Sequence, residues 1–479
     1  MNLDCGGKAQ RRHRFSAADR GSKAAWRYAS RRSPKNAVAA NAASGLSVIL
    51  GGQHIPTAVS RMSGVSFGID RVLAAPDLLR GKLGLVTNDA ARTAADSQLH
   101  SRLALQHAGF ELVRLFSPEH GIAANAADGT AVADAIDPLT GLPIVSLYGE
   151  RMRPPRESLT DLDAMLFDVP DIGARFYTYI WTLSHVLEAC ADAGVPLVVL
   201  DRPNPLSGDL AAAEGPILDT EKFSSFVGRA AIPIRHSLTM GELAQLWNAE
   251  WKLNAKLRII RCAGWQRAMH WPDTGLPFVP TSPAITSYEA ALLYPGLCLF
   301  EGTNLSVGRG TPLAFHGVGA PWLRAREVVG RFNECSLGPE RRSPIRHESD
   351  TITHRAGSET GAPPIAAEAA SFIPQLPPYI GERCEAVRLL VHDAKAFRPV
   401  AAGLRLMATI IELHREEFRW AQYPTAANPG GEGHFERLVG RAGIRETLEA
   451  DSADLDARVK EWTEATGWRD RVRCALLYD

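Results

Sequence analysis

The stretch LVRLFSPEHG, residues 112–121, joins an apolar run to a short polar turn. The apolar half has the pattern of a buried strand, and Glu119 and His120 follow where that strand should end. Pro118 restricts the turn, and Gly121 allows the chain to leave at a sharp angle. In α/β folds such strand ends carry ligand sites, so an acid and an imidazole here predict a functional site. The alternative is a carboxylate that caps a surface turn.

The same pattern recurs between residues 83 and 205. Near-continuous aliphatic runs of this kind are typical of strands buried on both faces of a parallel sheet. Helical patterns separate several of the runs, at residues 95–108 and 176–193, and Gly109 and Gly194 are placed to end them. The sequence therefore predicts an α/β fold with a Rossmann-like, doubly wound and mostly parallel sheet. The other predicted strands cover residues 83–86, 144–147, 165–169 and 196–200.

Each predicted strand ends in polar residues. Because the carboxyl ends of parallel strands share one edge of the sheet, we expect these residues to face one crevice. They are Asn88, Glu119, His120, Tyr148, Asp171 and Asp201.

The composition limits the classes of function. A chain of 479 residues is too long for one ordinary core, and we expect two domains and a tail. With 53 basic and 53 acidic residues, no net field attracts nucleic acid. The seven cysteines lack Cys-x-x-Cys spacing, which indicates neither a zinc site nor a disulfide framework. No window approaches the roughly 18 apolar residues that a membrane-spanning helix needs.

The N-terminus is strongly basic. Residues 1–35 contain ten Lys and Arg against two Asp, a local charge of +8. The sequence SRRS at residues 30–33, followed by a weakly apolar stretch at 37–52, has features of a twin-arginine export signal. The alternative is a disordered basic extension, with the protein beginning near Met62. Cytoplasmic and exported locations both stay open.

The second half predicts a smaller α/β domain. Thr239 and Glu242 form a capping-box pattern that starts a helix ending near residue 251. Strands are expected at 257–262 and 386–391, a helix at 400–413, and mostly helix from 435 onward. Residues 338–380 lack periodicity and predict a long loop or insertion. The predicted domains are a 1–62 extension, a Rossmann-like catalytic domain at 63–235 and a C-terminal domain at 236–479.

Two further segments carry candidate binding residues. The loop at 264–283 contains Trp265, Trp271 and Phe278, which either floor a sugar site or close a domain interface. The stretch EGTNLSVGRGT at 301–311 combines three glycines with Arg309, whose guanidinium suits a carboxylate. Neither phosphate-loop nor dinucleotide spacing is present, so no cofactor is expected.

Together these motifs identify a resemblance. FSPEHG (116–121), SLYG (146–149), DIGARFYTY (171–179), LDRPNP (200–205), EGP (214–216) and the 301–311 stretch resemble the exo-β-N-acetylmuramidase (NamZ-type) family. This family is glycoside hydrolase family 171, formerly a domain of unknown function. The resemblance covers about residues 65–479. It implies a Rossmann-like domain, a smaller C-terminal domain and a cleft between them. The implied activity is release of terminal β-linked N-acetylmuramic acid from the non-reducing end of peptidoglycan fragments in cell-wall recycling.

The resemblance also implies roles for single residues. Glu119, in the Ser-Pro-Glu-His-Gly motif, is the expected general acid/base. Glycoside cleavage needs a second group at the anomeric carbon, and its identity stays open. The candidates are Asp171, Glu188, Glu214 and Glu301, where Asp171 alternatively caps a helix and Glu188 is alternatively a solvated helix position.

Other residues are expected to bind the substrate. Three arginines are candidates for binding the lactyl carboxylate of the substrate: Arg175, Arg202 and Arg309. For Arg175 and Arg202, an ion pair that joins strand ends is an equally good explanation. His120 either binds substrate or holds Glu119. The substrate-binding set comprises Asn88, His120, Tyr148, Arg175, Tyr177, Arg202, Asn204, Glu214 and Arg309, and Tyr179 is a further candidate.

The chain departs from the family pattern at six positions. Pro170 replaces the usual Gln, Ala284 an Asn, Ala314 a Pro and His316 a Glu, whereas Ser237 stands where a Gly is usual and Ala124 at or near the place of another Gly. These departures support one alternative, a non-catalytic cell-wall glycan-binding protein derived from the family. A second alternative is a metal-dependent hydrolase that uses Glu119, His120, Asp171 and Asp201.

Overall fold

The computed structural model describes residues 64–336, 363–450 and 454–479, all within one compact unit. The predicted basic extension and export signal therefore lie outside the described residues. Within the described ranges, no helix combines the length and apolarity needed to span a membrane.

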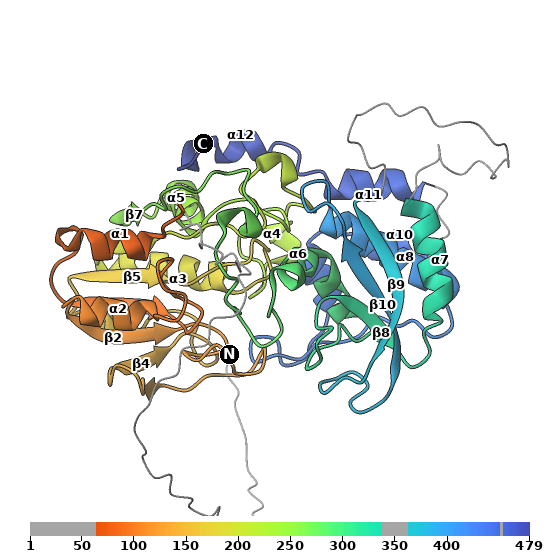
Figure 1. Cartoon of the computed structure of the whole chain (residues 1–479), viewed down its shortest axis with the longest axis horizontal. Helices are drawn as coiled ribbons and strands as arrows, with labels where there is room; N and C mark the ends of the chain where they lie inside the picture. The colour runs from red at the N-terminus through yellow and green to blue at the C-terminus, as the bar shows by residue number, and fades with distance from the viewer. Residues whose placement is uncertain (1–63, 337–362, 451–453) are drawn as a thin grey trace, which may run out of the picture. The chain divides into compact units, whose positions relative to one another are not determined.

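The larger sheet has seven strands in the order β3-β4-β2-β1-β5-β6-β7 (Figure 1). Only β3 is antiparallel to its neighbour, so the predicted doubly wound, mostly parallel sheet is confirmed. All residues of β1, β5 and β6 are buried, as expected for strands covered on both faces. The strands are β1 (Leu83–Thr87), β2 (Leu112–Ser117), β3 (Ala135–Ile136), β4 (Pro143–Ser146), β5 (Ala164–Asp168), β6 (Leu197–Leu200) and β7 (Leu257–Ile260).

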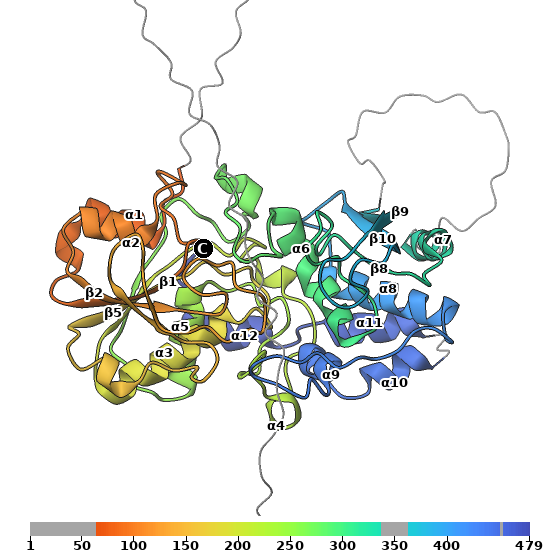
Figure 2. The ribbon, with the colours of Figure 1, turned by 90° about the horizontal axis from the view of Figure 1, so that it is seen from below.

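Helices cover both faces of this sheet (Figure 2). On one face α1 (Gly68–Ala74) and α2 (Ser101–His107) pack on Leu83 and Leu85 of β1. On the other face α3 (Tyr179–Ala193) and α5 (Met240–Glu250) join the core that contains Val86. Successive side chains of a strand point to opposite faces, so one apolar run supplies both cores.

The predicted helix boundaries are partly wrong. The helix expected at 95–108 begins only at Ser101, because Asp96 closes a turn in front of it: its carbonyl accepts from Thr93 Oγ1 at 3.0 Å, and its carboxylate from the Gln98 N–H at 2.8 Å. The next helix begins at Tyr179 rather than 176. Gly194 caps it in the left-handed conformation with φ 72°, as predicted.

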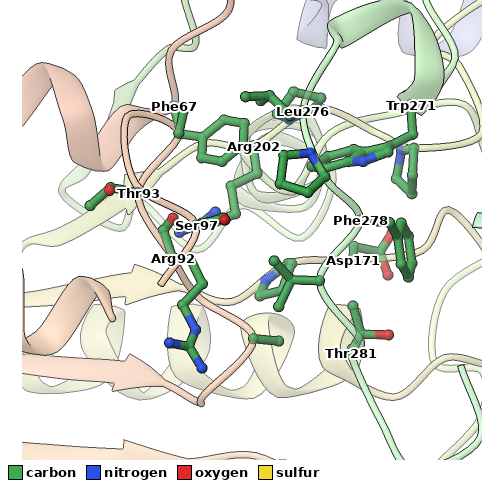
Figure 3. Close-up of a pocket in the computed structure, with 17 residues that line it drawn as sticks. Phe67, Arg92, Thr93, Ser97, Asp171, Arg202, Trp271, Leu276, Phe278 and Thr281 are labelled. Carbon is green, nitrogen blue, oxygen red and sulfur yellow. Dashed lines mark hydrogen bonds between the residues drawn. The ribbon is translucent and has the colours of Figure 1, made fainter. Parts of the chain in front are cut away.

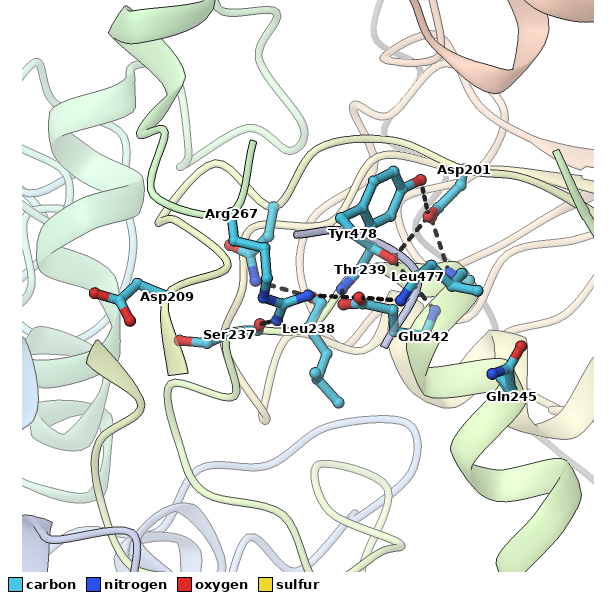
Figure 4. Close-up of polar contacts among 12 residues, drawn as sticks. Asp201, Asp209, Ser237, Leu238, Thr239, Glu242, Gln245, Arg267, Leu477 and Tyr478 are labelled. Carbon is cyan, nitrogen blue, oxygen red and sulfur yellow. Dashed lines mark hydrogen bonds and ion pairs between the residues drawn. The ribbon is translucent and has the colours of Figure 1, made fainter. Parts of the chain in front are cut away.

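Asp201 does not face a crevice, contrary to prediction. The side chain is fully buried and accepts hydrogen bonds from Thr239 Oγ1 at 2.7 Å, Gly241 N at 2.8 Å and Tyr478 Oη at 2.6 Å (Figure 4). It thereby holds the start of α5, where the predicted Thr239–Glu242 capping box is confirmed. The prediction failed because a carboxylate at a strand end also suits a neighbouring helix N-terminus.

The larger sheet continues past residue 235, where the sequence predicts a domain boundary, since α5 and β7 both follow it. Glu242 of α5 also binds distant chain: its Oε1 accepts from Arg267 Nη1 at 2.5 Å and from Leu477 N at 2.9 Å. Figure 4 shows this network beside Asp201 and Tyr478. The chain near residue 478 is thus attached to the larger sheet.

A second, smaller domain contains an antiparallel sheet in the order β8-β10-β9. It carries α7 (Ala325–Ser336) and α8 (Pro399–Leu413), and α8 packs in turn on α6 (Tyr288–Leu297). The strands are β8 (Gly317–Ala320), β9 (Ile365–Phe372) and β10 (Cys384–Val391), and the remaining helices are α4 (Thr220–Phe223), α9 (His434–Val439), α10 (Ile444–Glu449), α11 (Leu455–Thr463) and α12 (Trp468–Val472).

Residues 338–380 were predicted as a long loop or insertion, but β9 shows that part of this segment is a strand. Residues 338–362 of the segment lie outside the described residues. Half of the β9 sequence IAAEAASF is alanine, a poor strand former, so its pattern gave no signal. Pairing with β10 along its whole length holds it extended.

Candidate functional site

Glu119 follows β2 and lines a pocket, here named the Glu119 pocket. Both halves of the chain contribute to its wall. Of the residues predicted from sequence, the pocket brings together Glu119, His120, Tyr177, Glu301 and Arg309. It also contains Asp128, Thr178, Tyr423 and His434, which no sequence pattern predicted as site residues.

The Glu119 carboxylate is held from two sides. Oε1 accepts the backbone N–H of Gly129 at 2.7 Å, and Oε2 accepts Thr178 Oγ1 at 2.5 Å. The side chain is only 6% exposed. These two donors fix the carboxyl group in position.

His120 flanks the acid in an unusual backbone conformation, with φ 67°. Its Nδ1 lies 2.8 Å from the carbonyl oxygen of Ala126, which can only accept, so Nδ1 carries the proton. In the neutral ring, Nε2 is then the acceptor. Tyr148 is nearly buried beside Glu119; burial, and then the Glu119 charge, raise its pKa and keep the phenol protonated.

Arg309 is bound by two acids. Its Nε donates to Glu301 Oε1 at 2.6 Å, and its Nη1 lies 3.1 Å from Asp128 Oδ1. Tyr423 donates its hydroxyl to the other oxygen of Asp128. Burial works to raise the pKa of Asp128, but the Arg309 charge and the Tyr423 hydrogen bond outweigh it, and the net pKa is lowered. Burial raises the pKa of Glu301 despite Arg309.

This pairing changes the expectation for Arg309. The sequence suggested a guanidinium available to a substrate carboxylate, yet two protein carboxylates already surround it. Asp128 gave no signal because its Asp-Gly dipeptide is typical of any turn. Its role emerges only when Gly129 is seen to bind Glu119.

A second pocket lies where the strand order reverses between β1 and β5 (Figure 3). Phe67, Trp271 and Phe278 surround it, together with Asp171 and Arg202. Trp271 and Phe278 therefore line a pocket, whereas Trp265 packs inside the core against Tyr478, with ring centroids 4.9 Å apart.

Asp171 and Arg202 are tied to protein groups at this second pocket. Asp171 Oδ2 accepts from Gly173 N at 2.8 Å and lies 3.2 Å from His236 Nε2. Arg202 pairs with Asp168, Nε to Oδ1, at 2.6 Å. Tyr177, which lines the Glu119 pocket, donates its hydroxyl to Oγ1 of Thr281, which lines the second pocket, at 2.8 Å. The structure therefore separates Asp171 from the Glu119 pocket.

The remaining predicted site residues join segments of the fold. Glu188 of α3 forms an ion pair with Arg229 at 3.1 Å. Glu214 accepts a hydrogen bond from the Ala401 N–H at 2.7 Å. Asn88 is fully buried, and its Oδ1 accepts from Ala90 N at 3.1 Å. Arg175 is also fully buried and donates to four backbone carbonyls, those of Pro216, Ile232, Leu438 and Val439. Asn204 binds the backbone of Leu206 and Leu238.

Comparison with known proteins decides the family. The model for the N-terminal part of exo-β-N-acetylmuramidase NamZ matches residues 83–289, and the model for its C-terminal part matches residues 292–478. The chain belongs to the NamZ family. The two NamZ models meet at the start of α6, so β7 falls in the N-terminal one. The Glu119 pocket is therefore built from both NamZ parts, with Tyr423 and His434 from the C-terminal one.

Named relatives agree with this assignment. The chain is 37% identical over 390 residues to the peptidoglycan β-N-acetylmuramidase NamZ of Bacillus subtilis, covering 80% of this chain and 84% of that protein. Two DUF1343 family proteins of Bacteroides fragilis have similar crystal structures. One has a TM-score of 0.72 at 26% identity and covers 87% of this chain and 100% of its own. The other has a TM-score of 0.61 at 28% identity, covering 87% and 99%.

The residues of the metal-dependent alternative do not converge. Asp201 is buried under α5, and Asp171 lines the other pocket. Among the described residues no group of three or more His, Cys, Asp or Glu side chains is arranged to hold a metal ion.

Proposed function

We propose that this chain is an exo-acting glycosidase that releases terminal β-linked N-acetylmuramic acid from the non-reducing end of peptidoglycan fragments. The observation that carries the proposal is Glu119, held at both oxygens in a pocket formed by the two NamZ parts. The relative at 37% identity, named a peptidoglycan β-N-acetylmuramidase, supports the choice of sugar.

In the proposed reaction Glu119 protonates the leaving glycosidic oxygen. Cleavage of this bond develops positive charge at the anomeric carbon, which a second carboxylate stabilises or attacks, directly or through water. Gly129 and Thr178 hold the acid in place, so little reorganisation is needed as the proton moves.

For the second group we favour Asp128 over the sequence candidates Asp171, Glu188 and Glu301. A base or nucleophile must be ionised, and the pKa of Asp128 is lowered by Arg309 and Tyr423, which outweigh burial. Glu301 lines the same pocket, but burial raises its pKa. His120 and Tyr177 remain proposed substrate contacts, and Arg309 is proposed to hold Asp128 and Glu301. The residues proposed to support the fold are Asn88, Arg175, Arg202, Asn204 and Glu214.

A turnover assay tests the proposal. Purified protein is incubated with a chromogenic N-acetylmuramic acid β-glycoside, with and without EDTA, beside Glu119→Gln and the exposed-helix control Glu221→Gln. We expect wild-type and control turnover that survives EDTA and is lost in Glu119→Gln. Loss with EDTA supports the metal-dependent alternative, and saturable binding without turnover supports the non-catalytic alternative.

A further inference from the structure

His434 is the first residue of α9 and lines the Glu119 pocket from the C-terminal part of the chain. It is 3% exposed, and its ring stacks on Tyr423 with centroids 4.6 Å apart and an interplanar angle of 18°. Neither ring nitrogen has a hydrogen-bond partner among the described residues. Because buried polar atoms are nearly always paired, two unpaired nitrogens in a pocket wall indicate a missing ligand.

The surroundings fix the form of the ring. Burial, followed by the charges of Arg437 and Arg309, lowers the pKa of His434 to about 4, against the opposing charge of Asp128. At neutral pH the imidazole is therefore uncharged, with one N–H donor and one acceptor nitrogen. The N–H can donate to a carbonyl oxygen in the pocket, and because the two ring nitrogens point in widely divergent directions, one ligand group pairs with only one of them.

An apolar surface adjoins this polar pair. Leu438 lies four residues after His434, on the same face of α9, and lines the same pocket. Phe226 and Val227 line it as well. The wall thus offers an N–H donor and an apolar patch. An acetamido group has the complementary pair, a carbonyl and a methyl group.

We propose that His434 is a specificity residue that recognises the N-acetyl group of the sugar, with Leu438 receiving its methyl. This inference rests on the proposed function. It predicts strong discrimination, because a sugar without the acetyl group leaves buried polar atoms unpaired and places an ammonium against an apolar wall.

The test compares chromogenic β-glycosides of N-acetylmuramic acid and of muramic acid, whose amine is free. His434→Phe keeps the stack on Tyr423 and removes donor and acceptor, whereas His434→Gln keeps one of each. His107→Phe, at an exposed position on α2, is the control. We expect kcat/KM on the acetylated substrate to fall roughly 10- to 100-fold in His434→Phe, mainly through KM. For the substrate with a free amine, we expect kcat/KM of His434→Phe to change less than about threefold. His434→Gln should recover part of the kcat/KM that His434→Phe loses on the acetylated substrate.

Equal losses on both substrates, or no loss on either, overturn the inference, with folding checked by thermal melting. If the wild type cleaves neither glycoside, the proposed function fails, and calorimetry then tests the inference alone. Wild type that binds N-acetylmuramic acid more tightly than muramic acid, with the difference lost in His434→Phe, supports it. Equal affinity for the two sugars overturns it.

Discussion

Thr178 donates its hydroxyl to Oε2 of Glu119 at 2.5 Å, although the two residues lie 59 positions apart in the sequence. A hydrogen bond contributes about 0.5–1.5 kcal/mol between neutral groups and about 1.5–3 kcal/mol where one partner is charged. We therefore expect Thr178→Val, which removes the donor without changing the shape, to lower kcat roughly 10- to 100-fold with little change in KM. Steady-state kinetics on the chromogenic substrate measures both constants.

Thr178→Ser restores the hydroxyl and should restore most of kcat. Thr409→Val removes a comparable hydroxyl from α8, far from the pocket in sequence, and controls for general loss of stability. Unchanged kcat in Thr178→Val contradicts a positioning role for this hydroxyl.

Ser237 adopts φ 57° at a position where the resemblance expects glycine. The left-handed conformation costs a non-glycine residue about 1–2 kcal/mol. Substitution by glycine removes this cost from the folded state, but it also makes the unfolded chain more flexible, which offsets part of the gain in stability. We expect Ser237→Gly to raise the free energy of unfolding by roughly 0.5–1 kcal/mol.

Denaturant unfolding measures this change. Ser224 is the matched control, because its φ of −56° is an ordinary value for a non-glycine residue. Ser224→Gly should leave the free energy of unfolding unchanged or reduce it. Ala124, at φ 52°, should behave like Ser237. A less stable Ser237→Gly variant would show that its backbone is not strained.

Glu214 makes stability depend on pH. Burial raises its pKa from the ordinary 4.5 to about 7, against the opposing effects of the Ala401 N–H and the Arg235 charge. Because its pKa is higher in the folded than in the unfolded state, Glu214 binds its proton more tightly in the folded state. The protonated Glu214 therefore stabilises the fold fully below about pH 4.5, and this stabilisation is lost as pH rises toward 7. We expect Glu214 to account for a fall of up to about 3 kcal/mol over this window.

Comparing wild type with Glu214→Gln isolates this effect, because other groups titrate in the same range. Asp201, with its pKa raised to about 6 mainly by burial, acts in the same direction. His270 and His434, with pKa lowered to about 4 mainly by burial, act in the opposite direction. Parallel pH profiles of the two proteins would exclude the contribution of Glu214.

Gly296 of α6 and Gly403 of α8 let these helices cross closely. A Cβ on Gly403 would lie 2.5 Å from the Gly296 carbonyl oxygen, and one on Gly296 would lie 2.0 Å from the Pro399 carbonyl oxygen. Because backbone lies on both sides, overpacking cannot relax cheaply, and we expect Gly403→Ala to destabilise by about 1–3 kcal/mol. Gly330, on α7, has nothing within 4 Å of such a Cβ, so Gly330→Ala should be neutral or stabilising. Equal melting temperatures for the two variants would contradict the close crossing.

The sequence predicted those features that depend on local pattern. Buried aliphatic runs identified five strands of the larger sheet and the acid after β2, because a strand buried on both faces has a distinctive composition. It did not show which polar strand ends share a pocket. Asp201 and Glu119 have similar contexts in the sequence, yet one anchors α5 and the other lines the pocket.

Residues from distant segments were the least predictable. Asp128, Tyr423 and His434 enter the Glu119 pocket only through the packing of the two NamZ parts, which no local pattern encodes. β9 was missed because its stability comes from pairing with β10, not from its alanine-rich sequence.

The hydrogen bond from Tyr478 to Asp201 has a consequence for biosynthesis. The two residues are separated by 277 positions, and a ribosome adding about 5–20 residues per second needs on the order of tens of seconds to bridge them. Throughout that interval the nascent sheet emerges with the Asp201 carboxylate lacking its tyrosine partner. The helix anchor at Asp201 is therefore complete only after another 277 residues have been translated, and a ribosome stalled before Tyr478 would release a partly stabilised domain.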